Sequence, residues 1–250
     1  MNSEMSLEMS TELIIILTVF VASFVRGVSG FGAALITMPI LSGLTSIYVA
    51  APLVAIIGLT NDALLCLYYR RSVEWNIVVK LWTGSVLGIP VGFLILRFFP
   101  SNWMVSALGL MITAYAIYAL FEPPIPTLKS PRWIYGTGFL CGALGGSYNI
   151  PGPPIILYGS SQRWSQKKFK SNLSIFFWGN ALLVVSGHIF ENRYSIAVLQ
   201  QYALTIPSII IGLAVGTALS QFFNPLIFRK IVLLILSIIG LRLLALGIQS

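Results

Sequence analysis

The chain has 250 residues, of which 57% are hydrophobic and 9% charged, and its formal net charge is +8. Soluble globular domains carry roughly 25% charged residues, so this composition excludes a soluble domain and predicts an integral membrane protein. The basic residues flank apolar runs, as the positive-inside rule expects of cytoplasmic loops. The charge therefore indicates orientation in a membrane and no nucleic-acid partner.

Long apolar runs follow one another along the chain and predict an all-α polytopic membrane protein. A helix that crosses a bilayer needs about 20 apolar residues. In chain order, an apolar region at 12–45 is broken midway by glycine and proline, and uninterrupted runs follow at 48–69, 75–99 and 103–121. A second broken region lies at 132–160, before uninterrupted runs at 170–189, 196–222 and 226–247. Residues 122–132, rich in proline and charge, predict a linker between a first repeat, 1–121, and a second, 133–250.

The two halves share short motifs in the same order, which predicts a duplication. "GIPVG" at Gly88–Gly92 resembles "GLAVG" at Gly212–Gly216, and "NDALL" at Asn61–Leu65 resembles "GNALL" at Gly179–Leu183. The broken regions also align, with Gly27, Gly30 and Pro39 matching Gly142, Gly145 and Pro154. Glycines at such spacing are common wherever membrane helices pack closely, so only the shared order makes the duplication convincing.

The placement of basic residues predicts that the two halves are inverted relative to each other. Loops 70–80 and 161–170 are the most basic, so both are expected in the cytoplasm. Both can be cytoplasmic only if 132–160 enters and leaves on the cytoplasmic side. By the same count 12–45 enters and leaves on the outer side, which fits its acidic N-terminus, so both regions are expected to be broken or re-entrant helical hairpins. Each half then has one hairpin and three transmembrane helices, and both termini lie outside. Inverted repeats with a broken apolar segment in each half are typical of secondary transporters.

The broken segments predict a binding site, because free N–H groups at membrane depth are tolerated only inside protein or facing a water-filled cavity. Arg26 lies about 14 residues, or ~20 Å of helix, into the first region. A buried guanidinium favours an anion, although pairing with a structural carboxylate or carbonyl is the alternative. The expected substrate-binding residues lie on the two glycine-rich tips: Arg26, Ser29, Gly30, Phe31 and Gly32 on the first, and Gly145, Gly146, Ser147, Tyr148 and Asn149 on the second. Close packing between helices is the other explanation for the glycines and serines.

Asp62 is the chain's one aspartate and lies within the run 48–69. A carboxylate inside a membrane-spanning run is expected to gain and lose a proton during transport, or else to pair with a cation such as Arg26. Its neighbour Asn61 and its counterpart Asn180 complete the predicted coupling group. With a single histidine, His188, and two cysteines, neither a metal site nor a cofactor is expected.

At these tips the sequence resembles the sulfite exporter TauE/SafE family of small membrane transporters. The similarity rests on Gly-x-x-Gly-Phe-Gly followed by proline, from Gly27 to Pro39, and on its echo from Gly142 to Pro154. The resemblance implies a multi-pass protein of the bacterial cytoplasmic membrane that moves a small sulfur-containing anion such as sulfite or sulfoacetate. The second tip departs from the family pattern, because "GGSYNIPGPP" carries Tyr148, Asn149 and three prolines.

The expected mechanism is alternating access, with protons as the candidate coupling ion and the lipid bilayer and a small anion as partners. An anion channel of the same fold is the main alternative. An intramembrane enzyme would need a nucleophile and a base or a metal cluster, and the chain offers one histidine and one aspartate.

Overall fold

The structure is a computed structural model that describes residues 2–69, 72–121, 126–128 and 130–249. Helices account for nearly all of these residues, and the described part contains no strand. The helices are α1 (Asn2–Ser29), α2 (Ala33–Leu44), α3 (Ile47–Tyr69), α4 (Trp75–Phe98), α5 (Ser101–Phe121), α6 (Arg132–Tyr148), α7 (Gly152–Ser161), α8 (Gln166–Phe190), α9 (Ile196–Leu219) and α10 (Pro225–Gln249). The all-helical prediction is confirmed.

Seven helices in the described part are long and apolar enough to cross a membrane: the Ser10–Ser29 part of α1, and α3, α4, α5, α8, α9 and α10. The six uninterrupted runs expected from the sequence are among them. The first broken region differs from the second, because its leading helix could span a bilayer by itself. The corresponding helix α6 has only 17 residues.

Both broken regions are interrupted where glycine and proline predicted it. Between α1 and α2, Gly30 and Gly32 have φ values of 82° and 96°. Residues with a Cβ rarely adopt this backbone conformation. Asn149 ends α6 in the left-handed region with φ 57°, and Asn is the usual residue there after glycine. Pro151 follows and disfavours a continuous helix through Ile150.

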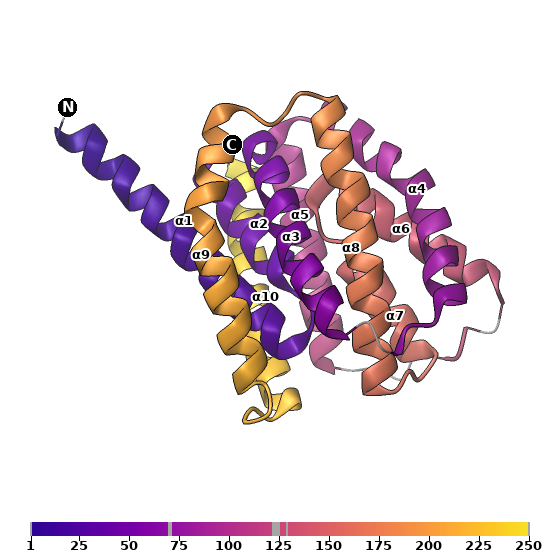
Figure 1. Cartoon of the computed structure of the whole chain (residues 1–250). Coiled ribbons are helices and arrows are strands. Elements are labelled where there is room, and N and C mark those ends of the chain that lie inside the picture. Colours follow the sequence, from indigo (N-terminus) through magenta and orange to yellow (C-terminus); the bar gives the residue numbers. More distant parts are fainter. Residues whose placement is uncertain (1, 70–71, 122–125, 129, 250) are drawn as a thin grey trace.

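Helices from the two halves pack against each other in pairs (Figure 1). The closest pairs are α4 with α6, α5 with α10, α1 with α9 and α3 with α8. If α1 to α5 correspond to α6 to α10, the repeat relates the α1–α9 pair to the α6–α4 pair. It relates the α3–α8 and α5–α10 pairs each to itself. The division into two repeats and their inversion stay predictions, and this pairing supports them.

Glycine stripes let these helices approach closely. On α4 and α6 the stripes face each other: Gly84, Gly88 and Gly92 on the first and Gly138, Gly142 and Gly146 on the second. A Cβ at any of these positions would overlap the backbone of the other helix. Gly27 on α1 and Gly212 and Gly216 on α9 are arranged similarly. Most of the glycines that mark the repeat in the sequence are thus packing residues, as in other membrane helix pairs: Gly27, Gly88, Gly92, Gly142, Gly212 and Gly216.

The two basic loops meet at one end of the molecule, as the sequence predicts. Glu74 forms an ion pair with Lys168, and its backbone N–H donates to Asn172 Oδ1 at 2.9 Å. Ser171 Oγ donates to the Tyr69 carbonyl at 2.6 Å. We call this the basic end. Figure 1 shows the start of α1 and the end of α10 toward the opposite side.

Cysteine labelling in intact cells tests the predicted orientation of the basic end. Ser46→Cys and Asn192→Cys lie at exposed positions in the α2–α3 and α8–α9 connections, and both should react with an impermeant reagent added outside. Ser72→Cys and Arg163→Cys should react only after the membrane is permeabilised. Labelling of the basic end in intact cells would overturn this orientation.

Candidate functional site

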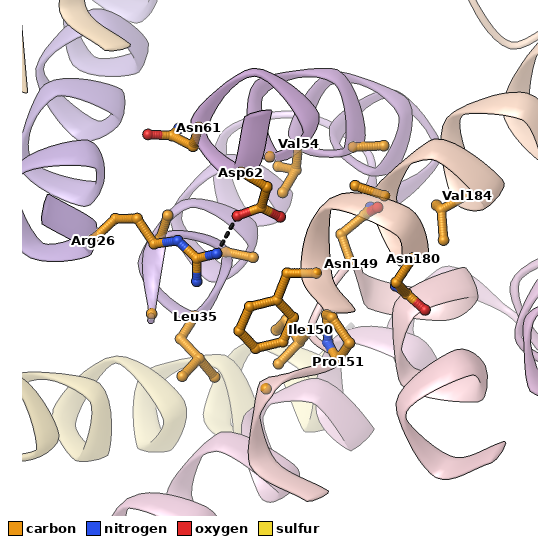
Figure 2. Close-up of a pocket in the computed structure, with 18 residues that line it drawn as sticks. Arg26, Leu35, Val54, Asn61, Asp62, Asn149, Ile150, Pro151, Asn180 and Val184 are labelled. Carbon is orange, nitrogen blue, oxygen red and sulfur yellow. Dashed lines mark hydrogen bonds and ion pairs between the residues drawn. The ribbon is translucent and has the colours of Figure 1, made fainter. Parts of the chain in front are cut away.

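A cavity of about 60 Å³ lies where the two chain breaks meet the middle of α3 and α8. Its lining includes the end of α1 and start of α2, the residues between α6 and α7, and residues near Asn61 and Asn180. Figure 2 shows Arg26 and Asp62 on one side of this cavity and Asn149 and Asn180 on another. We call it the central pocket.

Arg26 and Asp62 form a buried ion pair at this pocket, in which a guanidinium nitrogen donates to the carboxylate (Figure 2). Arg26 is 5% exposed and Asp62 8%. The guanidinium carbon also lies 4.8 Å from the centre of the Phe177 ring, a cation–π contact that strengthens when water is excluded. The sequence leaves two roles open for these residues: binding of an anion or a proton, and pairing with an opposite charge. The structure shows that they pair with each other.

Not every polar atom beside this ion pair is hydrogen-bonded. Within the described part of the chain, Arg26 Nε and Asn61 Oδ1 are buried and have no hydrogen-bond partner, while Asn61 Nδ2 donates to the Ile57 carbonyl at 3.1 Å. Buried polar groups are normally paired, so unpaired ones beside a cavity mark a place where a polar ligand or water fits.

The amino terminus of α2 also faces the central pocket. Ala33, Ala34 and Leu35 form its first turn and line the cavity, and Gly32 supplies no side-chain cap. The N–H groups of a first turn have no partner inside the helix, and the helix dipole there favours negative charge. α7 offers fewer donors, because Pro153 and Pro154 lie in its first turn and proline lacks an N–H.

The second half contributes two asparagines that are held in place by other helices. Asn149 Nδ2 donates to the Ala51 carbonyl at 2.7 Å and so ties the α6–α7 break to α3. Asn180 Oδ1 accepts a hydrogen bond from Ser85 Oγ. Neither side chain can carry charge. The cation and carboxylate of the pocket therefore both come from the first half.

The structure brings part of the predicted site together at the central pocket: Arg26, Gly32, Asn61, Asp62, Asn149 and Asn180. Ser29 and Phe31 line two other cavities toward the basic end, and Gly30 lies beside the Lys170 side chain.

The remaining second-tip residues serve packing. Gly146 contacts α4, and Gly145 lies against the Asn180 amide. Ser147 Oγ donates to the Ala143 carbonyl at 2.8 Å, and the Tyr148 hydroxyl contacts Met104 Sδ at 3.6 Å. The predicted set of site residues included neither Phe177 nor the first turn of α2, although free N–H groups at the chain break were expected. The glycine before Ala33 signals the latter, whereas no sequence pattern distinguishes Phe177 from its neighbours.

The chain matches the family described as "Sulfite exporter TauE/SafE" over residues 15–243. A protein from Cupriavidus necator, described as "Probable sulfite/organosulfonate exporter TauE", is 24% identical over 235 residues, which cover 91% of each chain. No solved structure matches the chain. The family match spans all the residues that line the central pocket. The chain belongs to the sulfite exporter TauE/SafE family of membrane transporters.

Proposed function

We propose that the chain moves a small sulfur-containing anion, such as sulfite, sulfoacetate or another organosulfonate, across the membrane by alternating access. The observation that carries the proposal is the buried Arg26 guanidinium in a pocket that also receives the α2 first turn. Both features favour an anion. The name of the Cupriavidus necator relative supports a sulfite or organosulfonate and favours export.

Family membership makes the chain a multi-pass membrane transporter and sets aside the intramembrane enzyme. The channel alternative is distinguished by a transport assay. The purified protein in liposomes should show saturable counterflow of labelled sulfite or sulfoacetate, in which unlabelled anion inside drives uptake of labelled anion. Sustained unitary currents without counterflow would favour a channel. Counterflow with neither anion, but with a carboxylate, would overturn the sulfur-containing substrate.

The Arg26–Asp62 contact supports a way to couple the anion to a proton. The carboxylate accepts a hydrogen bond from a guanidinium N–H that an incoming anion would otherwise use. An anion that takes over Arg26 leaves Asp62 buried without its cation, and such a carboxylate is stabilised by taking up a proton. Anion and proton then move together in the same direction. Binding of either favours binding of the other, since such coupling is reciprocal.

A pH gradient across the liposome membrane tests this coupling. In the wild type, acid on the side that holds the anion should accelerate its net movement to the other side. Asp62→Asn should keep anion-for-anion exchange, which need not move a proton, and should lose the acceleration. Glu191→Gln is the matched control, because it removes a carboxylate from the α8–α9 connection, outside the pocket. Normal gradient-driven transport by Asp62→Asn would rule out the coupling role.

A further inference from the structure

Two larger cavities extend from the α1–α2 chain break to the basic end. One of about 280 Å³ is lined by the end of α1, the start of α8, the α9–α10 connection and the start of α10. The other, of about 290 Å³, is lined by Tyr68, Tyr69, Ser72, Gln166, Lys167, Lys170 and Ser171. The two cavities share Gln166 and Lys170. We call them together the basic vestibule.

Lys170 stands where the two parts of the vestibule meet. It is half-buried, and its side chain passes Gly30, where a Cβ would lie 3.6 Å from Lys170 Cγ. Its Nζ lies 3.5 Å from the Tyr69 hydroxyl and 5.3 Å from the centre of that ring. No carboxylate within the described ranges pairs with Lys170. The vestibule thus has a cation at its centre that none of the described acidic side chains neutralises.

A narrow space lies between the vestibule and the central pocket. It measures about 10 Å³ and shares Ser29, Phe31 and Phe228 with the vestibule and Gly32 and Leu35 with the central pocket. A single water molecule needs roughly 10–15 Å³, so an anion cannot pass while this space keeps its shape. The series of cavities leads from the basic end to Arg26 and is closed at this point.

Phe31 is held at the constriction by its own chain break. Its N–H donates to Ser29 Oγ at 3.3 Å, and Ser29 Oγ lies 2.6 Å from the Phe31 carbonyl. The flanking Gly30 and Gly32 both have positive φ, so the backbone on each side is of the kind that changes conformation without a Cβ clash. Phe31 is therefore flanked by two glycines of permissive backbone and is half-buried, and it lines both the narrow space and the vestibule.

We propose that Lys170 makes the basic vestibule a second anion-binding station, which holds the transported anion before or after it occupies Arg26, and that Phe31 separates the two stations. The inference rests on the proposed function for the identity of the anion. Its physical basis is separate, since a cation in a recessed, partly desolvated cavity concentrates small anions whatever their chemistry.

Cysteine labelling tests the station without any substrate. In a background with Cys66 and Cys141 replaced by alanine, Gln166→Cys should react faster with a sulfonate-bearing methanethiosulfonate than with its ammonium-bearing analogue. Lys170→Gln should reduce this preference about ten-fold, the low end of what charge-lined clefts do to local ion concentration, and Lys170→Arg should keep it. Thr127→Cys, in the linker outside both cavities, is the control and should not respond to Lys170. An unchanged preference in Lys170→Gln would overturn the station, whatever the transport assays show.

Three further measurements complete the test. In counterflow, Lys170→Gln should raise the KM for anion at the basic end about ten-fold with little change in kcat, and an unchanged KM would show that the station is not on the route. Phe31→Ala should make Leu35→Cys reactive to the sulfonate reagent from the basic end, and unchanged protection would overturn the role of Phe31.

Replacing phosphatidylcholine by phosphatidylglycerol should leave the labelling preference intact. Its loss would show that an anionic lipid headgroup competes for Lys170, which also overturns the proposal. Failure of wild-type counterflow with labelling as expected would overturn the proposed substrate alone.

Discussion

Asp62→Asn is expected to destabilise the protein much more than Arg26→Gln, although the two side chains form one ion pair. Removing one member of a buried pair leaves the other charge without compensation, which costs about 3–5 kcal/mol. A carboxyl group that has lost its cation can take up a proton and become neutral. Arginine cannot lose its proton in a protein. The full cost should therefore appear only in Asp62→Asn, where the guanidinium stays buried and charged.

Thermal unfolding in detergent measures this asymmetry, and added anion provides the link to function. The double variant Arg26→Gln/Asp62→Asn should regain most of the stability lost in Asp62→Asn, yet it should not bind the anion. In Asp62→Asn the anion replaces the missing carboxylate, so saturating sulfite or sulfoacetate should raise its melting temperature more than that of the wild type. Equal and small losses in both single variants, with no response to anion, would mean that Arg26 and Asp62 are exposed to water and do not form the site.

The chain breaks could be predicted from the sequence because local chemistry determines them. Gly30 and Gly32 permit positive φ, and Asn149 and Pro151 end α6 and prevent one continuous helix. Each effect acts within a few residues along the chain. The same holds for the basic loops, whose positions follow from charge alone and which the structure places side by side.

The composition of the central pocket could be predicted only in part, because it depends on which face each helix turns toward which neighbour. Pairing of Asp62 with a cation such as Arg26 was one of two roles expected from the sequence, but only the packed structure brings the two side chains into contact. Residues four apart share one face of a helix. Gly146 therefore contacts α4, as Gly142 does, and does not line the pocket. Phe177 was missed because nothing in a run of apolar residues indicates which ring will cover a guanidinium.

The glycine stripe between α4 and α6 gives a prediction with a closely matched control. A methyl group added at Gly142 would meet the Ser85 backbone, with its Cα at 2.8 Å, whereas no atom lies within 4 Å of the same addition at Gly136. Both glycines belong to α6. Gly142→Ala forces two backbones apart and should cost about 1–3 kcal/mol. Gly136→Ala should be neutral or stabilise by up to about 1 kcal/mol, since alanine favours helix more than glycine does.

The same pair of variants shows whether close packing of α6 positions the pocket. α6 ends at the break that presents Asn149, and Ser85 on the facing helix donates to Asn180. Moving α6 away from α4 in Gly142→Ala should therefore disturb both asparagines. Unfolding temperature and counterflow should fall together, while Gly136→Ala keeps both at the wild-type level. If Gly142→Ala melts and transports like Gly136→Ala, α4 and α6 are not in backbone contact. The second break would then be supported by its other contacts, among them the hydrogen bond from Asn149 to the Ala51 carbonyl of α3 and the contact of the Tyr148 hydroxyl with Met104.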